Sequence, residues 1–361
     1  MPVFSRQFGV TSAVSSLSLS LATGTLAVFM LVAATLSESR GRKTMMTLSL
    51  FCSAILALLI SFSPDFSVLL ALRALQGVAL AGLPSIAMAY VGEEFHPGSL
   101  GLAMGLYVSG TTVGGMVGRI AAGVLTDIYS WRVTLGAIGV LGLLCSLWFW
   151  IGLPASASFT PRPLAKRSLG TLFRHIKDPG LLCIFGIGFL LMGGFVALYN
   201  YVGYLLVAPP YGLSQAALGS IFVVYLAGTF SSAWMGKLAD DFGRPIILLV
   251  GIAIMFAGGF LTLVGNLYAI IAGVAAYTFG FFGSHSVASS WVGRRATVNK
   301  AQASSLYLLF YYAGSSLFGS VGGLFWSSYG WYGVVSMIVA LLLLAFLLTG
   351  ILSAAPLRGS T

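Results

Sequence analysis

Charge is what this sequence has least of. Only 7% of its 361 residues are Asp, Glu, Lys or Arg, against about 25% in an ordinary soluble domain. Hydrophobic residues make up 58%, and the mean hydropathy is +0.99. A water-soluble fold of this length would have too few charges to cover its surface, whereas a protein surrounded by lipid needs an apolar exterior. The composition therefore predicts a membrane protein.

Cysteine pairs and catalytic motifs are also missing. The three cysteines, Cys52, Cys145 and Cys183, lie inside apolar runs without a CxxC spacing or a histidine cluster, which predicts small buried side chains and no disulfide or zinc site. The sequence contains no GxSxG, P-loop or HExxH motif, and no basic, short-cored leader that would indicate a cleaved signal peptide. We therefore expect no enzyme activity, no metal and no cofactor.

Long apolar runs, in contrast, fill most of the chain. A bilayer core requires about 20 apolar residues per helix, and this length predicts eleven spans, near residues 13–36, 44–63, 66–92, 98–126, 131–153, 179–207, 214–238, 245–265, 267–292, 301–327 and 331–353. One long polar stretch separates the fifth span from the sixth. The sequence thus predicts an all-α membrane protein with a first half at 1–154 (five spans), a cytoplasmic linker at 155–178 and a second half at 179–361 (six spans).

The distribution of Lys and Arg predicts the orientation. Alternate loops and the C-terminal tail carry fourteen Lys or Arg residues, and the opposite loops carry two. Because basic loops stay in the cytoplasm, we expect a cytoplasmic C-terminus in a bacterial inner (plasma) membrane. The net charge of +10 is therefore a topology signal, and we expect the lipid bilayer as a partner and no nucleic acid.

An internal repeat with a period near 200 residues relates the two halves. Its three matching blocks are 34–42 with 236–244, 90–94 with 291–295, and 106–131 with 306–331. Parallel repeats around an axis along the membrane normal are a known transporter architecture. The repeat places the partner of the sixth span before Met1, so we expect that the first half lacks one helix. Residues 2–10 would be the loop after that helix, which favours a start assigned too late over a shortened transporter.

Several motifs in these blocks resemble those of the major facilitator superfamily. The segment 236–244, Gly-Lys-Leu-Ala-Asp-Asp-Phe-Gly-Arg, is similar to the family's cytoplasmic loop signature; its first copy at 34–42 departs from it with Ala34 and Glu38. Residues 73–77, Arg-Ala-Leu-Gln-Gly, resemble a second family motif, and the glycine run from Gly105 to Gly118 resembles the family's antiporter helix without its usual proline. The segments 114–119, 285–291 and 302–307 are similar to the YnfM type of bacterial inner-membrane permeases.

The resemblance implies two pseudo-symmetric helix bundles, with twelve helices in the family and about eleven here. It further implies secondary transport by alternating access: proton-coupled efflux of a small solute, sugar or drug-like, by a chain that we expect to act as a monomer. A solute importer of the same fold and a truncated, non-transporting membrane protein remain open alternatives.

Two arginines lie inside predicted spans, where charge is costly and marks a functional site. Arg73 and Arg119 are predicted at similar depth, lining a cavity, binding an anionic or polyhydroxyl solute or modulating a proton site. The alternative is a structural tie to backbone carbonyls or to Asp65 and Asp127.

Other polar and aromatic residues within spans are further candidates for the solute and proton pathway. His285 has a side chain suited to proton relay, with a packed structural histidine as the alternative. Aromatic rings with a polar tip are able to line a polar cavity or to anchor a helix at the interface. Among the polar and aromatic residues we select Asn200, Tyr201 and Tyr311.

The two copies of the loop signature predict a cytoplasmic gate. An acidic residue there is able to accept hydrogen bonds from a neighbouring helix N-terminus, and an arginine is able to pair with a carboxylate across the bundle. The alternative is that these residues only form turns and set the topology. The predicted gate residues are Glu38, Gly41, Arg42, Asp240, Gly243 and Arg244.

Overall fold

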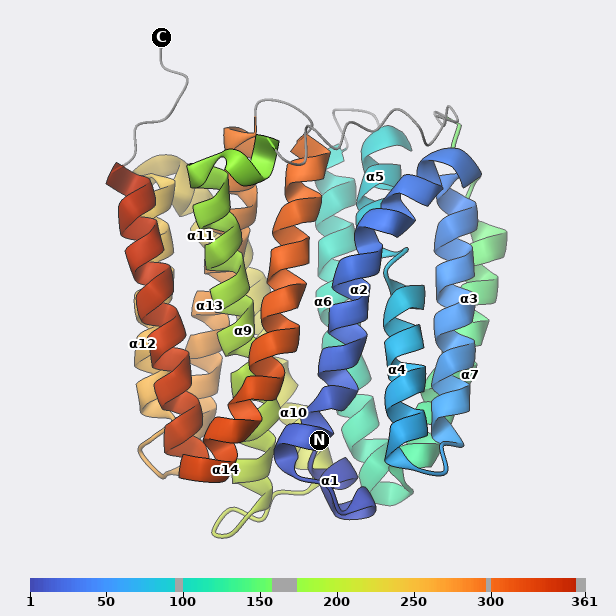
Figure 1. Ribbon diagram of the computed structural model, residues 1–361, viewed down its shortest axis with the longest axis vertical. Helices are drawn as coiled ribbons and strands as arrows, with labels where there is room; N and C mark the ends of the chain where they lie inside the picture. The colour runs from blue at the N-terminus through green and yellow to red at the C-terminus, as the bar shows by residue number, and fades with distance from the viewer. Residues whose placement is uncertain (95–99, 158–173, 297–299, 355–361) are drawn as a thin grey trace.

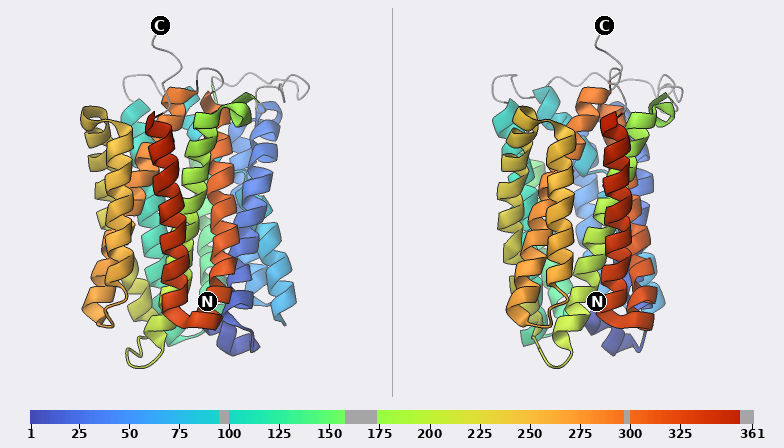
Figure 2. Two further views of the ribbon diagram at one scale, coloured as in Figure 1. Left: turned by 60° about the vertical axis from the view of Figure 1, so that its left-hand side comes forward. Right: turned by 90° about the vertical axis from the view of Figure 1, so that its left-hand side faces the viewer.

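Long helices lying side by side make up the fold (Figure 1). The computed structural model describes residues 1–94, 100–157, 174–296 and 300–354, and in these residues it contains helices and connecting turns without a strand. Two further views show the same roughly parallel arrangement of helices (Figure 2). The predicted all-α membrane fold is confirmed.

The described residues before the predicted linker form seven helices. They are α1 (Pro2–Phe8), α2 (Ser12–Arg40), α3 (Arg42–Ser61), α4 (Phe66–Leu80), α5 (Pro84–Glu94), α6 (Leu100–Ile128) and α7 (Trp131–Gly152). The short helix α1 occupies the segment predicted as a loop.

The residues after the linker form α9 (Pro179–Val207), α10 (Gln215–Ser220), the 3-10 helix η2 (Ile221–Val224), α11 (Tyr225–Phe242), α12 (Arg244–Leu261), α13 (Leu267–Arg295) and α14 (Lys300–Ala354). Helix α14 contains two helical segments, because Gly330 has a left-handed backbone (φ 59°) between them. Most of the predicted linker, residues 158–173, lies outside the described residues.

Eight helices of the described residues are long and apolar enough to cross a membrane, with α14 counted once and α10 to α11 counted as one. The third predicted span differs, since it is broken into α4 and α5. Pro84 opens α5, and because a proline has no N–H and restricts the residue before it, α4 ends a few residues earlier.

The loop signature forms the same turn in both halves. Gly41, between α2 and α3, has φ 94° and ψ 145°, and Gly243, between α11 and α12, has φ 91° and ψ 141°. A residue with a Cβ rarely adopts this backbone conformation. The repeat seen in the sequence therefore reproduces a backbone geometry as well as a residue pattern.

The two halves stand next to each other. Helices α2 to α7 lie on one side of Figure 1, and α9 with α11 to α14 lie on the other. Helix α2 packs against α14, and α6 packs against α10. The largest buried cluster lies in the second half around α9, whose apolar side chains pack against α13 and α14.

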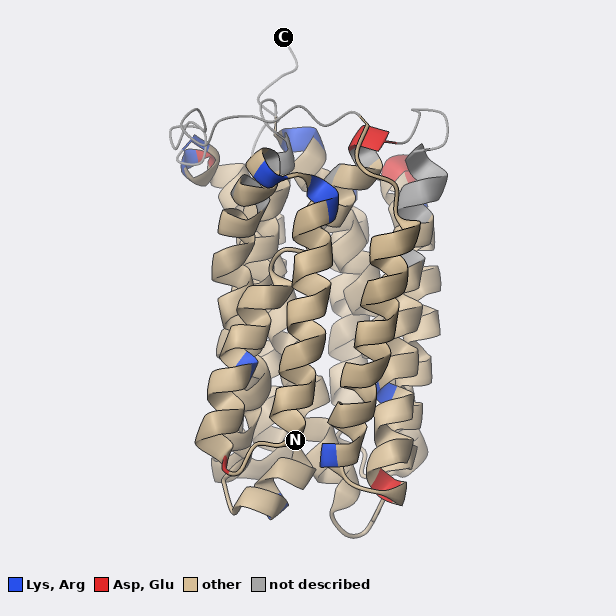
Figure 3. Cartoon of the chain, turned by 90° about the vertical axis from the view of Figure 1, so that its right-hand side faces the viewer, with Lys and Arg blue, Asp and Glu red and all other residues tan. Residues whose placement is uncertain are grey.

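Charged residues gather at the ends of the helices (Figure 3). We call one end the basic end; it holds Arg42, Arg244, Arg294 and Arg295, which lie at the boundaries of α3, α12 and α13. The opposite end holds α1, Asp65 and Asp127.

Candidate functional site

A cavity of about 400 Å³ lies between the two halves, towards the opposite end. Residues of α1, α2, α6 and α7 line it from the first half, and residues of α9, α10 and η2 together with Tyr225, the first residue of α11, line it from the second. Pockets for small molecules in proteins are of this size, about 300–1,000 Å³. Two of the predicted site residues, Arg119 and Asn200, belong to the lining.

Arg119 extends from α6 towards aromatic rings of the second half. Its guanidinium carbon is 4.9 Å from the ring centre of Phe222 and 5.4 Å from that of Tyr225. Its Nη1 donates to the carbonyl of Gly115, one turn back in α6 (2.9 Å). Among the described residues no carboxylate lies within ion-pair distance of Arg119. A cation facing ring faces in this way is stabilised by the negative π surface.

Arg73 occupies a different environment, although the sequence predicts a similar role for it. Its Nε donates to the carbonyl of Ser18 in α2 (2.8 Å), and its Nη1 donates to Oε1 of Gln76 (2.8 Å). Gln76 in turn donates to the carbonyl of Ser53 in α3 (3.1 Å). Arg73 thus joins α4 to its neighbours and does not line the cavity. This arrangement matches the alternative prediction for Arg73, a structural tie to backbone carbonyls.

Asn200 and Tyr201 are neighbours in α9 with different surroundings. Both donate to the carbonyl of Gly319 in α14, from Nδ2 at 3.4 Å and from the phenol at 2.8 Å. Asn200 also faces the cavity, whereas Tyr201 is fully buried in the second half. Of this pair, only Asn200 is placed to meet a solute.

His285 and Tyr311 belong to an aromatic column in the second half. Nδ1 of His285 forms a hydrogen bond with the hydroxyl of Tyr307 (2.9 Å), and the imidazole lies 4.6 Å from the ring of Tyr311. Phe281 stacks on Phe195 at 3.9 Å between ring centres, and Phe195 lines the cavity. The column therefore leads from the cavity wall to His285.

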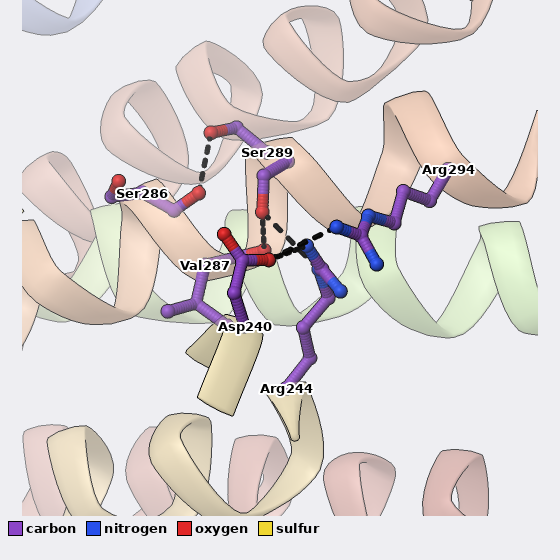
Figure 4. A network of polar contacts seen from close by, with 7 residues as sticks. Asp240, Arg244, Ser286, Val287, Ser289 and Arg294 are labelled. Atoms are coloured by element: carbon purple, nitrogen blue, oxygen red, sulfur yellow. Dashed lines mark hydrogen bonds and ion pairs between the residues drawn. The ribbon is translucent and has the colours of Figure 1, made fainter. Parts of the chain in front are cut away.

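The predicted gate residues of the second half form a compact group at the basic end. Oδ1 of Asp240 accepts from Nη2 of Arg244 (2.8 Å) and from Nη2 of Arg294 (3.0 Å), as Figure 4 shows. Nε of Arg244 also donates to the hydroxyl of Ser290 (3.4 Å). We call these four residues the basic-end cluster; all of them come from α11, α12 and α13.

In the first half, Arg42 pairs with Glu93 of α5 (2.8 Å). The side chain of Glu38 lies outside the described part of the structure. The repeat aligns Glu93 with Arg294, so the two halves carry opposite charges at this position. Among the described residues, no ion pair at the basic end joins the two halves.

Contacts that join the halves lie in the middle and at the opposite end. Asp127, at the end of α6, accepts hydrogen bonds from the backbone N–H groups of Gln215 (2.8 Å) and Ala216 (2.6 Å) at the start of α10. Ser5 of α1 bonds Tyr204 of α9 (2.7 Å), and Ser316 of α14 donates to the carbonyl of Ser20 in α2 (2.7 Å). None of these contacts follows from the sequence, because which loop faces which cannot be inferred from spacing.

The glycines of α6 differ in how closely other helices approach them. No atom lies within 4 Å of a Cβ placed on Gly110, Gly114 or Gly118, so these glycines make no close helix contact among the described residues. The close approach is made by Gly123, where a Cβ would meet the carbonyl oxygen of Gln215. At 100° per residue, Gly123 lies on the face of α6 opposite to Gly114.

Comparisons with known proteins identify relatives over most of the chain. The family model of the Major Facilitator Superfamily matches residues 1–284. The uncharacterized MFS-type transporter YybF of Bacillus subtilis is 54% identical over 98% of this chain and 88% of its own length. The inner membrane transport protein YnfM of Escherichia coli is 44% identical over 96% of this chain and 84% of its own.

Solved structures agree on the fold. A bacterial homologue of the human lysosomal transporter Spinster, in an inward-facing and unoccupied conformation, superimposes with a TM-score of 0.78 over 97% of this chain and 91% of its own, at 17% sequence identity. At this identity the likeness concerns the fold alone.

Proposed function

Because this chain belongs to the Major Facilitator Superfamily, we propose that it is a secondary active transporter that exports a small solute, sugar or drug-like, in exchange for protons. Its relatives are transporters, so the chain is a multi-pass membrane transporter and not an enzyme. The resemblance to the YnfM-type permeases is confirmed.

The observation that carries the proposal is the cavity shared by the two halves. A binding site at the interface of two repeats becomes accessible from either side of the membrane when the repeats rock against each other. Arg119 of the first half and Asn200 of the second face this cavity. One chain supplies both walls, which supports transport by a monomer.

The positions of the polar contacts support alternating access. Hydrogen bonds between the halves lie in the middle and at the opposite end, and the ion pairs at the basic end stay within each half. If the basic end is cytoplasmic, as the positive-inside rule predicts, the conformation is closed towards the outside. The relative with a known inward-facing structure has the same overall arrangement.

The predicted gate residues at the basic end fit this transport cycle. In the present conformation Asp240 is neutralised by two arginines of its own half. We infer that these partners change when the basic end closes, since rocking of the halves brings the ends of α5 and α13 into new surroundings.

His285 is our proposed proton site. The described parts of the membrane helices contain no acidic residue away from the helix ends, and an imidazole is the side chain that changes charge most readily near neutral pH. The hydrogen bond to Tyr307 and the contact with Tyr311 give it polar and aromatic neighbours close to the cavity wall.

Solute accumulation in bacteria tests the proposal. Cells without their main efflux pumps would express the chain and receive labelled sugars, dyes and antibiotics, with and without a protonophore. We expect lower accumulation of at least one compound than in cells with the empty vector, and loss of the difference with the protonophore. Higher accumulation would favour the importer. No difference for any compound, with the chain present in the membrane, would favour the non-transporting alternative.

A further inference from the structure

The cavity carries one charged side chain among its described lining residues, that of Arg119. A guanidinium has five N–H donors, and among the described residues that of Arg119 donates one hydrogen bond, to the carbonyl of Gly115. The ring faces of Phe222 and Tyr225 stabilise the positive charge but accept no conventional hydrogen bond from it. Arg119 therefore has donors and a charge available on the cavity side.

An uncompensated cation inside a membrane protein is costly, and an anionic ligand removes that cost while it is bound. The planar fork of arginine matches a carboxylate, which accepts two parallel hydrogen bonds. Since Arg119 is the one cation of the lining side chains, it compensates a single negative charge. A second charge on the ligand would remain unpaired in an apolar cavity.

The rest of the cavity wall indicates the chemistry of the uncharged part of the ligand, which we call its body. It consists mainly of apolar and aromatic side chains, including Met192, Phe195 and Ile221. The hydroxyl of Tyr199 is already bonded to Thr278 (2.7 Å). A sugar needs hydrogen-bond partners for most of its hydroxyl groups, because unpaired buried polar groups are costly. Beyond Asn200, Gln215 and the hydroxyls of Thr126 and Tyr225, this wall offers few partners.

From the charge and the wall together, we propose that the solute is a monocarboxylate with an apolar, ring-bearing body. Its carboxylate binds Arg119 and its body packs against Phe195 and the ring of Phe222 in η2. This inference rests on the proposed function, in that it assigns the solute class of the same cavity. It favours the drug-like solute over the sugar.

Binding of matched acids and amides to the purified full-length protein tests the inference. The probes are benzoate, cinnamate and 1-naphthoate, each beside its neutral carboxamide, at pH 7. We expect at least one acid to bind at least tenfold more tightly than its amide. The variant Arg119→Gln should remove this preference, and Arg119→Lys should retain part of it, because lysine keeps the charge without the fork.

Arg132→Gln is the matched control. Arg132 also lies near the opposite end, but it binds the carbonyl of Ser63 and the ring of Trp131, and it does not line the cavity. The acid preference should survive this change. Equal binding of acid and amide, no binding of any acid, or unchanged acid binding by Arg119→Gln in a variant with the elution profile of the folded protein would overturn the inference. Export of a neutral compound in the accumulation assay would then leave the proposed function standing, whereas no export of any compound would contradict the function itself.

Discussion

At the scale of single residues, Asp178 holds the start of the second half in place. Its carboxylate accepts from the backbone N–H groups of Gly180 and Leu181 in the first turn of α9 and from Nε of Arg295 (2.9 Å). Burial alone would raise the pKa of Asp178, but the hydrogen bonds from Leu181 and Arg295, together with the charge of Arg295, hold this pKa below its ordinary value. A side chain on residue 180 would overlap the guanidinium of Arg295.

Asp178→Asn keeps a capping oxygen but removes the charge, so we expect a loss of about 1–3 kcal/mol of unfolding free energy at pH 7. Because the folded-state pKa is lowered, the charged carboxylate stabilises the folded protein at pH values above the unfolded-state pKa of about 4. This stabilisation is lost as the pH falls through the folded-state pKa. The difference between wild type and variant should therefore shrink on acidification.

Thermal unfolding of the purified protein in detergent at pH 7 and at lower pH measures both effects. Lys177→Gln changes the charge next to Asp178 at an exposed position, where the side chain has no ion-pair partner among the described residues, and should leave the melting temperature nearly unchanged. A difference that grows towards acidic pH would contradict the assigned role of Asp178.

The two membrane arginines illustrate what could be predicted for the site. Both Arg73 and Arg119 are predicted as site residues because each places a charge within an apolar run, where burial of charge is costly. Which of the two faces the cavity depends on the rotation of α4 and α6 about their axes relative to other helices. That rotation is fixed by packing between segments far apart in the chain, so the sequence of one span does not contain it.

At the scale of helices, the basic-end cluster joins α11, α12 and α13. Asp240 is more than half exposed at its side chain, as is Arg294, whereas Arg244 is 13% exposed. Exposed ion pairs contribute roughly 0–1 kcal/mol to stability. The cluster is therefore suited to bias a conformation without fixing the fold.

Asp240→Asn should accordingly lower the transport rate about fivefold or more, the range of typical couplings between conformational states, with little change in melting temperature. The physical reason is that Arg244 and Arg294 then repel each other without a carboxylate between them. Transport rates of the compound found in the accumulation assay provide the measurement.

The adjacent residue offers the matched control for this prediction. Asp241→Asn removes an equal charge one position further, where the side chain has no ion-pair partner among the described residues, and should transport at the wild-type rate. Equal transport rates for the two variants would contradict a role of the basic-end cluster in transport, and its residues would then only form a turn and set the topology.

Helix positions were largely predictable, since a run of about 20 apolar residues crosses a bilayer whatever its neighbours are. The predicted spans correspond to single helices, to runs of consecutive helices or, for 301–327 and 331–353, to the two segments of α14. The chemistry of proline explains the break between α4 and α5 before Pro84. The apolar residues on either side of it nevertheless resemble one continuous span, so the sequence did not predict the break. The contact face of α6 at Gly123 could not be predicted, because glycines spaced four apart indicate a smooth face but not whether another helix packs against it.

At the scale of the whole molecule, the repeat relates the two interfaces between the halves. Gly123 of α6 lies against Gln215 of α10, and its counterpart Gly323 of α14 lies against Ala13 of α2. In each case a Cβ would overlap the facing backbone. Two pseudo-equivalent helices thus approach the other half closely, and in the proposed transport cycle the halves would rock along this pair of contacts.

The central claim, transport by rocking of the halves, is tested by tying α2 to α14. A Cβ on Gly24 would lie 3.5 Å from the Cβ of Ser316, at the short end of the spacing of disulfides, about 3.5–4.5 Å. The double variant Gly24→Cys with Ser316→Cys would be made in a background in which Cys52, Cys145 and Cys183 are replaced by serine. The compound from the accumulation assay is then followed in proteoliposomes under oxidising and reducing conditions.

We predict that oxidation stops transport by the double variant, that reduction restores it, and that each single-cysteine variant stays active under both conditions. A protein that is fully cross-linked by gel analysis and still transports at the reduced rate would contradict movement of the two halves against each other.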